Sequence, residues 1–328
     1  MKIFYFLNSF PGQYLVQSLV HSLIAVIIVD FALIIWRIEK PSLRQRLRFI
    51  VVAFPVVSFP LYQVVNPERG NTYFRLNEAL FDTTRLLTIE IWGKVPVSII
   101  LFIIILLTVV VFLIQEFVPV VKQFMESGNE ELEQSDDPHY KERVMRALAA
   151  LPERDVNVSV IEDEDHLIFS TTGRNSVVYI TTGLIDDLDD EQLKAALAHE
   201  VAHIIRNRRP LLIVVFFLRV IMFYNPVTLV EFRRIVEEEE KICDDIAISW
   251  TQRPDVLVET LNKFYIQEES LKDNRRKGFE SIEEYSHNML IKGRIDRLVM
   301  GEGKSVRWFW IKFLAVFSSI VIINYYIV

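Results

Sequence analysis

The stretch AHEVAHIIRNRRPLLIVVFFL, residues 198–218, sets a short polar motif directly against a run of apolar residues. His199, Glu200 and His203 form the motif, and the apolar run begins at Leu211. The polar residues suit a reaction that consumes water, whereas the apolar residues are most stable away from water. A fold for this chain has to accommodate both.

The composition indicates a chain that lies partly in a membrane and partly in water. Of the 328 residues, 51% are apolar and 24% are charged, which is more apolar than an ordinary soluble domain. The net charge of −7 is spread along the chain, so no direct binding of nucleic acid is expected. Cys243 has no second cysteine to pair with, which predicts a reducing compartment for the water-soluble part.

Some apolar segments are long enough to cross a bilayer, which takes roughly 20 residues. The predicted spans are Tyr14–Trp36, Leu47–Val64, Val95–Val118 and Trp308–Val328. The loop of residues 37–47 is short and basic, and such loops stay in the cytoplasm. We therefore expect a multi-pass protein of the cell membrane with both termini and loop 65–94 outside. Residues 1–118 would hold three spans, residues 119–306 a cytoplasmic domain, and residues 307–328 the last span.

The cytoplasmic domain is expected to be α+β. It opens with an acidic linker, residues 126–140, of a composition typical of a solvated spacer. Helical spacing follows over Lys141–Leu151, and then two strand-like runs, VNVSVIED and HLIFSTTGRNSVVYITTGL, the second with a turn at GRN. Asp189, with Gln192 three residues later, predicts the N-cap of the helix that carries the polar motif.

The polar motif has the spacing of a catalytic zinc site. Residues four apart share one face of a helix, so His199 and His203 can bind one metal ion. Glu200 points about a third of a turn away, where it can take a proton from a water that zinc has made acidic. An exposed helix that happens to carry two histidines is the alternative, and the small and apolar residues around the motif disfavour it. One Zn²⁺ per chain is the expected cofactor.

A third zinc ligand is expected downstream, because a catalytic zinc usually has three protein ligands and one open position. The run EEEEKICDDIAI offers candidates. We expect Glu240 to bind zinc, with Asp244 on the same helical face accepting the second N–H of a ligand histidine. Glu237 is the alternative ligand, and Glu237, Glu238 and Glu239 are otherwise expected to form a solvated face.

These motifs resemble those of a known family. HEVAHI, FYNPVTLVEFRR and ExxCDD, preceded by VYITTGLIDDLDDEQLKAALA, are similar to the BlaR/MecR-type integral-membrane zinc metallopeptidases. The resemblance spans most of the chain and implies a gluzincin-like domain in which His199, His203 and Glu240 bind zinc and Glu200 is the general base. It also implies cleavage of cytoplasmic targets such as a transcriptional repressor.

The chain departs from the receptors of that family in stopping at Val328, where they continue into an extracellular penicillin-binding sensor domain. A β-lactam receptor role is therefore not expected. A more distant resemblance to the HtpX/Ste24-type membrane proteases rests on HExxH…ExxxD and a later R-I-x-x-L, here Arg294, Ile295 and Leu298. It implies membrane-protein quality control as an alternative function, although the FYNP and CD elements favour the receptor type. A signalling scaffold with a structural or idle zinc site is an alternative of another class.

The apolar segment of residues 210–226 is short for a span and contains Arg219. If His203 and Glu240 bind one ion, the chain between them must leave and return on one side of the membrane. We therefore expect a re-entrant or interfacial hairpin that turns near Asn225-Pro226, with a helix buried in the soluble domain as the alternative. Nearby arginines are expected at the lipid headgroups: Arg206, Arg208 and Arg209.

Other residues have more than one interpretation. The strand of Val177, Val178, Tyr179 and Ile180 is either the edge that receives an extended substrate peptide or a core strand. Candidates for stabilising the oxyanion are Tyr285, His287 and Arg294, each of which also suits a surface or packing position. Cys243 is expected to be a packed residue. His21 and Asp30 lie within the first span, where ionisable groups are costly, and we assign them no function.

The expected partners are the lipid bilayer and a protein substrate, for which a transcriptional repressor is one candidate. A sensor protein and a second copy of the chain are left open as further partners.

Overall fold

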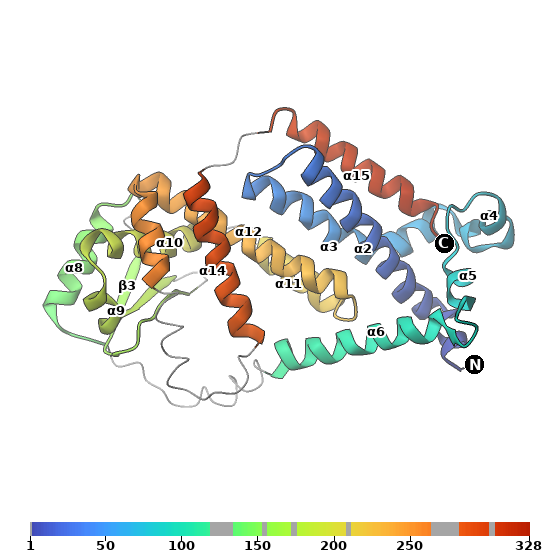
Figure 1. The fold of residues 1–328 in the computed structure, drawn as a ribbon, viewed down its shortest axis with the longest axis horizontal. Helices are drawn as coiled ribbons and strands as arrows, with labels where there is room; N and C mark the ends of the chain where they lie inside the picture. The colour runs from blue at the N-terminus through green and yellow to red at the C-terminus, as the bar shows by residue number, and fades with distance from the viewer. Residues whose placement is uncertain are drawn as a thin grey trace. The chain divides into compact units, whose positions relative to one another are not determined.

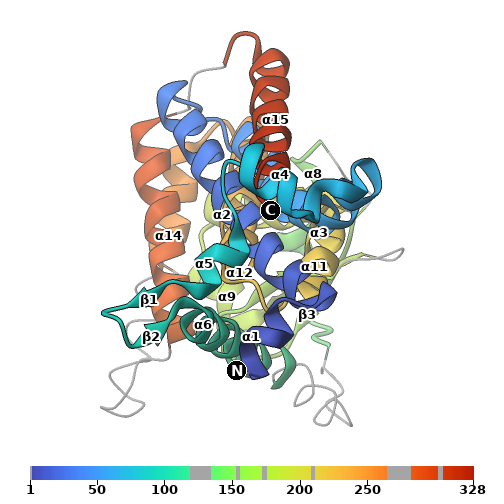
Figure 2. The same ribbon diagram turned by 90° about the vertical axis from the view of Figure 1, so that its right-hand side faces the viewer.

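The computed structural model describes residues 2–118, 134–152, 156–171, 176–207, 211–263, 282–301 and 306–328 (Figures 1 and 2). The chain forms two compact units, each assembled from separate stretches. We call the first the helical unit; it comprises Met1–Asn129, Ile213–Val236 and Lys304–Val328. We call the second the α+β unit; it comprises Glu130–Leu212 and Glu237–Gly303.

Three long apolar helices dominate the helical unit: α2 (Phe10–Ile35), α3 (Pro41–Val65) and α6 (Val97–Phe112). Each is long and apolar enough to cross a membrane, α6 together with its continuation to Gln115. The prediction of three long apolar helices here is confirmed, but α2 and α3 begin several residues earlier than expected. Both have a proline in their first turn, where the fixed backbone of proline favours helix initiation. Hydropathy locates the apolar part of such a helix and misses its polar first turn.

The last expected span corresponds to α15 (Phe309–Tyr325), a shorter apolar helix of 17 residues. It packs against α2 and α3 in one apolar cluster that includes Val29, Val51 and Ile320. Arg69 lies at its C-terminal end and donates hydrogen bonds to the carbonyl oxygens of Tyr325, at 2.7 Å, and Asn324, at 3.1 Å. A cation suits the carbonyl end of a helix, so the end of α15 is held by the loop after α3.

That loop and the chain's start contain short elements. They are α1 (Lys2–Leu7), η1 (Pro67–Gly70), α4 (Thr72–Asn77), α5 (Thr83–Thr88), β1 (Glu90–Ile91) and β2 (Val95–Pro96), while the π-helical η2 (Leu113–Phe117) follows α6. In Figure 1, α4 and α5 lie at the end of the helical unit that holds the C-terminus.

The apolar segment after the polar motif forms a helical hairpin of α11 (Leu211–Ile221) and α12 (Pro226–Thr251). Its turn lies beside the middle of α2, because Tyr224 Oη is 2.9 Å from Ser18 Oγ and Asn225 Nδ2 donates to Ser22 Oγ at 2.7 Å. The turn is where the sequence predicted it. The hairpin therefore belongs with the apolar helices, which does not fit the alternative of a helix buried in the α+β unit.

The α+β unit contains a three-stranded sheet. Its elements are α8 (Pro138–Ala149), β3 (Asn157–Ile161), β4 (Ile168–Ser170), β5 (Val177–Thr181), α9 (Thr182–Asp187), α10 (Asp190–Asn207), the second half of α12, and α14 (Ile282–Met300). The strand order is β3-β5-β4, with β5 parallel to β3 and antiparallel to β4.

The assignment of Val177, Val178, Tyr179 and Ile180 as an edge strand is wrong. These residues form β5, which is hydrogen-bonded on both sides, to β3 and to β4. Its backbone groups are already used and cannot pair with a peptide. The core-strand interpretation holds, since Val178 and Ile180 are fully buried.

The N-cap of α10 is a reciprocal capping box. Asp189 Oδ1 accepts from the backbone N–H of Gln192 at 2.8 Å, and Gln192 Oε1 accepts from the N–H of Asp189 at 3.2 Å. The prediction of this start is confirmed. The helix is buried along most of its length, with Leu197, Ala198 and Val201 inaccessible to solvent. The alternative of an exposed helix is therefore wrong.

Candidate metal centre

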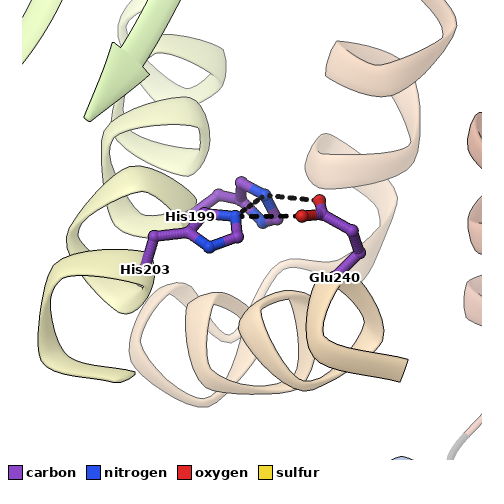
Figure 3. A group of neighbouring side chains, drawn as sticks. All are labelled: His199, His203 and Glu240. Atoms are coloured by element: carbon purple, nitrogen blue, oxygen red, sulfur yellow. Dashed lines mark hydrogen bonds and ion pairs between the residues drawn. The ribbon is translucent and has the colours of Figure 1, made fainter. Parts of the chain in front are cut away.

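Two histidines of α10 and one glutamate of α12 meet in the α+β unit, their side chains directed at one another (Figure 3). His199 Nε2 and His203 Nε2 are 3.1 Å apart. Glu240 Oε2 lies 3.4 Å from His199 Nε2, and Glu240 Oε1 lies 3.4 Å from His203 Nε2. Three potential ligand atoms therefore converge on one point.

The spacing of these atoms fits a tetrahedral zinc ion. Ligand atoms about 2.0–2.1 Å from zinc are separated by about 3.3–3.4 Å when the angle between them is tetrahedral. The three observed separations, 3.1, 3.4 and 3.4 Å, are close to that value. Two imidazoles and one carboxylate are also a donor set of catalytic zinc sites, which leave a fourth position open.

Asp244 contacts the ring nitrogen of His199 that does not face the other two potential ligands. Its Oδ1 is 3.1 Å from His199 Nδ1, which leaves Nε2 for a metal. Burial would raise the pKa of this carboxyl, but the charge of Arg294 and the hydrogen bond with His199 outweigh it and lower the pKa to about 2. Asp244 is therefore ionised and suited to hold the ring of His199 in one tautomer.

Arg294, from α14, contacts both acidic residues of the cluster. Its Nε and Nη2 donate to Asp244 at 2.9 and 2.6 Å, and its Nη1 donates to Glu240 Oε2 at 3.1 Å. Nη2 also lies 3.3 Å from His199 Nε2, so Arg294 contacts two of the three potential ligands as well as Asp244. An oxyanion role for Arg294 stays a prediction. The backbone of Tyr285 and His287 belongs to α14, and their side chains lie outside the described part of the chain.

The buried charges of the cluster depend on one another. Burial and the charge of Arg294 would lower the pKa of His199, but hydrogen bonds with Asp244 and Glu240 raise it to about 9. Burial would raise the pKa of Glu240, but hydrogen bonds with His199 and His203 hold it well below its usual value. The cluster therefore holds a proton that a metal ion would displace.

His203 has a different neighbour from His199. The Sγ of Cys243 lies 3.4 Å from His203 Nδ1, and burial raises the pKa of this thiol well above its ordinary value. The expectation that Cys243 is a packed residue is confirmed by its burial. Glu200, next to His199 on α10, is partly buried.

Two of the glutamates expected in solvent are buried instead. Glu238 and Glu239 are 2% and 4% exposed, and Glu239 accepts hydrogen bonds from Arg206 Nε and Nη2 at 2.7 and 2.6 Å. The charge of Arg206 is thus paired with Glu239 inside the α+β unit, and its position at the lipid headgroups stays a prediction. The sequence contained a sign of this pairing. Arg206 follows His203 by nearly one turn of α10, and Glu239 is next to Glu240 on α12. The contact between α10 and α12 that brings His203 to Glu240 therefore also brings Arg206 to Glu239. Arg208 and Arg209 lie outside the described residues.

Comparison with known proteins agrees with this geometry. Protease HtpX homolog 2 of Methanosarcina mazei is 33% identical over 103 residues, which cover 30% of this chain and 34% of that protein. The chain thus matches about a third of the length of this relative. Residues 80–254 match the Peptidase_M56 family, described as BlaR1 peptidase M56. Because that match covers more than half of the 328 residues and includes the histidines and glutamate of the cluster, the chain belongs to the BlaR1 peptidase M56 family, whose members are membrane metallopeptidases.

Proposed function

We propose that this protein is a membrane-embedded zinc endopeptidase with a gluzincin-like cytoplasmic domain. Its substrates would be proteins in the cytoplasm or next to the membrane, and its role signal transduction of the repressor-cleavage kind. One observation carries the proposal: His199, His203 and Glu240 have the separations of zinc ligands, with Glu200 beside them on the same buried helix.

Each residue of the cluster has a role in this proposal. His199, His203 and Glu240 would hold zinc, and Asp244 would fix the ring of His199. When bound, zinc supplies a Lewis acid that polarises the scissile carbonyl and makes water acidic. Glu200 would take the proton from the attacking water and deliver it to the leaving amine.

The proposed membrane arrangement has α2, α3, α6 and α15 as spans and the α11–α12 hairpin as a re-entrant element. The 11 residues of α11 rise about 16 Å, roughly half of a 30 Å hydrocarbon core. The turn beside the middle of α2 agrees with that depth. The basic loop of residues 37–47 would face the cytoplasm, with both termini outside the cell membrane.

The family favours a cytoplasmic regulator such as a transcriptional repressor. The match with Protease HtpX homolog 2 favours quality control of membrane proteins as a second candidate function. A sensor protein and a second copy of the chain remain candidate partners, and the scaffold alternative differs from both enzymes in having no use for Glu200.

Replacement of Glu200 by Gln tests the enzyme against the scaffold. Because the change removes the base and leaves the ligands, we expect one zinc per chain by elemental analysis and loss of cleavage by at least about 10²-fold. Proteomic comparison of cells that carry the wild type or Glu200→Gln would identify the substrate by its new termini. As a control, His203→Ala should lose zinc as well as cleavage. Cleavage or signalling that survives Glu200→Gln would rule out the proposed activity.

A further inference from the structure

Charged side chains of three helices meet in the helical unit. Arg48 Nη1, on α3, lies 3.3 Å from Asp30 Oδ1, on α2, and 2.9 Å from Glu231 Oε2, on α12. Arg234 Nη1, also on α12, lies 3.2 Å from Asp30 Oδ2 and 2.6 Å from Glu231 Oε1. Each cation thus contacts both anions. We call these four residues the α12 anchor.

The anchor is buried on the side of Arg48 and Glu231. Glu231 is inaccessible to solvent and Arg48 is 5% exposed, whereas the side chains of Asp30 and Arg234 are 37% and 39% exposed. Two positive and two negative charges balance, so the group as a whole is neutral. A buried ion pair often stabilises a fold no better than apolar residues of the same size, whereas loss of one partner is strongly destabilising. Stability alone therefore gives little reason for four charges here, and their directional contacts suggest a role in fixing position.

The anchor and the third ligand lie on opposite faces of one helix. Glu231 and Glu240 are nine residues apart on α12, which contains no proline or glycine after its first residue. Nine residues correspond to about 900° of rotation, which is two and a half turns, and to a rise of about 13.5 Å. One face of α12 therefore holds the anchor, and the opposite face presents Glu240 to His199 and His203.

A small rotation of α12 would displace the ligand. The carboxylate of Glu240 lies roughly 5–6 Å from the helix axis, so a rotation of about 10° moves it by about 1 Å. Metal–ligand distances tolerate only about 0.2 Å, and a misplacement of about 1 Å can cost about 10²-fold in rate. The hydrogen bond from Asn225 to Ser22, at 2.7 Å, restrains the start of α12 along its length. The anchor restrains its rotation.

We propose that Asp30, Arg48, Glu231 and Arg234 are positioning residues for the peptidase reaction. The anchor sets the rotation of α12 against α2 and α3, and so places the Glu240 carboxylate opposite the two histidines. A shift of either apolar helix then reaches a zinc ligand through one continuous helix. The inference rests on the proposed function of the metal centre.

The test compares single and paired replacements in the purified full chain in lipid vesicles. Arg48→Met and Glu231→Leu each take one of two partners from a buried charge and leave the group with a net charge. Together they remove a neutral pair and leave Asp30 with Arg234. We expect the single variants to lower Tm and the double variant to recover it. All three should bind zinc about tenfold more weakly in competition with a chelator. Their Co²⁺-substituted forms should show an altered visible spectrum, and kcat on labelled casein should fall about 10–100-fold with KM unchanged.

The matched control is Arg233→Gln, which removes a positive charge from the same helix outside the anchor; Arg233 is exposed and contacts Gln115. It should leave zinc affinity and the Co²⁺ spectrum unchanged. If the double variant recovers zinc affinity and the Co²⁺ spectrum together with Tm, the anchor only stabilises the fold and the inference is wrong. If a single variant fails to fold, the double variant can still be compared with the wild type. A wild type that binds neither Zn²⁺ nor Co²⁺ refutes the proposed function instead.

Discussion

At the scale of single residues, the two histidines of the metal centre are held unequally. The second ring nitrogen of His199 faces the carboxylate of Asp244 at 3.1 Å, whereas that of His203 faces the thiol of Cys243 at 3.4 Å. A carboxylate is a strong acceptor and raises the basicity of the ligand, while sulfur is a weak one. His199 is therefore the ligand whose orientation is more firmly set.

Replacement of Asp244 by Asn tests this inequality. The change removes the charge that holds His199 and pairs with Arg294, so we expect zinc to bind about 10–100-fold more weakly. Competition with a chromophoric chelator measures the effect. Asp245→Asn is the matched control, because Asp245 is the adjacent carboxylate and pairs with Arg297 on the same two helices. Equal effects of the two changes would contradict the role of Asp244.

At the scale of elements, the α11–α12 hairpin joins the metal centre to the apolar helices. Its turn contacts Ser18 and Ser22 of α2, and its second helix continues into the α+β unit and ends at Thr251. A short helix that enters an apolar bundle needs its polar groups satisfied there. The side chain of Asn225 meets that need, because it bonds Ser22 and accepts from the N–H of Val227.

The depth of the hairpin can be measured with introduced cysteines. If it is re-entrant, Phe223→Cys in its turn should not react with a membrane-impermeant maleimide from either side of a sealed vesicle, because the turn lies within the hydrocarbon. Cys243 does not interfere, since it is buried. Glu39→Cys should react from the cytoplasmic side and Lys94→Cys from the outer side. Labelling of Phe223→Cys as fast as Glu39→Cys would place the turn in water.

At the scale of the whole molecule, the metal centre couples the stability of the fold to pH. In the metal-free protein the pKa of His199 is raised from 6.5 to about 9. A group whose folded pKa is raised stabilises the fold fully below its unfolded pKa and loses that contribution as pH rises through the folded pKa. The metal-free fold should therefore weaken between pH 6.5 and about 9. Zinc, which displaces the same proton, binds more tightly over the same window.

Thermal unfolding with and without a chelator measures this coupling. We expect the difference in Tm between the zinc-loaded and chelator-treated protein to grow as pH rises from 6.5 to about 9. His139→Gln, at the exposed start of α8, should leave the trend unchanged. A difference that stays constant or shrinks over this range would contradict the mutual stabilisation of His199, Asp244 and Glu240.

The sequence by itself determined the features that depend on residues close together along the chain. Hydropathy over some twenty residues locates α2, α3 and α6, the Asp189 and Gln192 pair begins α10, and a spacing of four places His199 and His203 on one face. Glu240 and Asp244 follow from the same spacing on α12. These features depend on helix geometry and on neighbours along the chain.

The tertiary structure alone decided which distant residues meet. It placed β5 between two strands and buried Glu239 against Arg206. It also brought Arg294 to Asp244 and brought together the four residues of the α12 anchor from α2, α3 and α12. Asp30 in an apolar span was a sign of that anchor, but its partner Arg48 lies on the next helix and Glu231 follows two hundred residues later. A buried charge requires a partner of opposite charge. The sequence shows that Asp30 needs such a partner but does not identify it, because only the packing of the helices brings the two residues together.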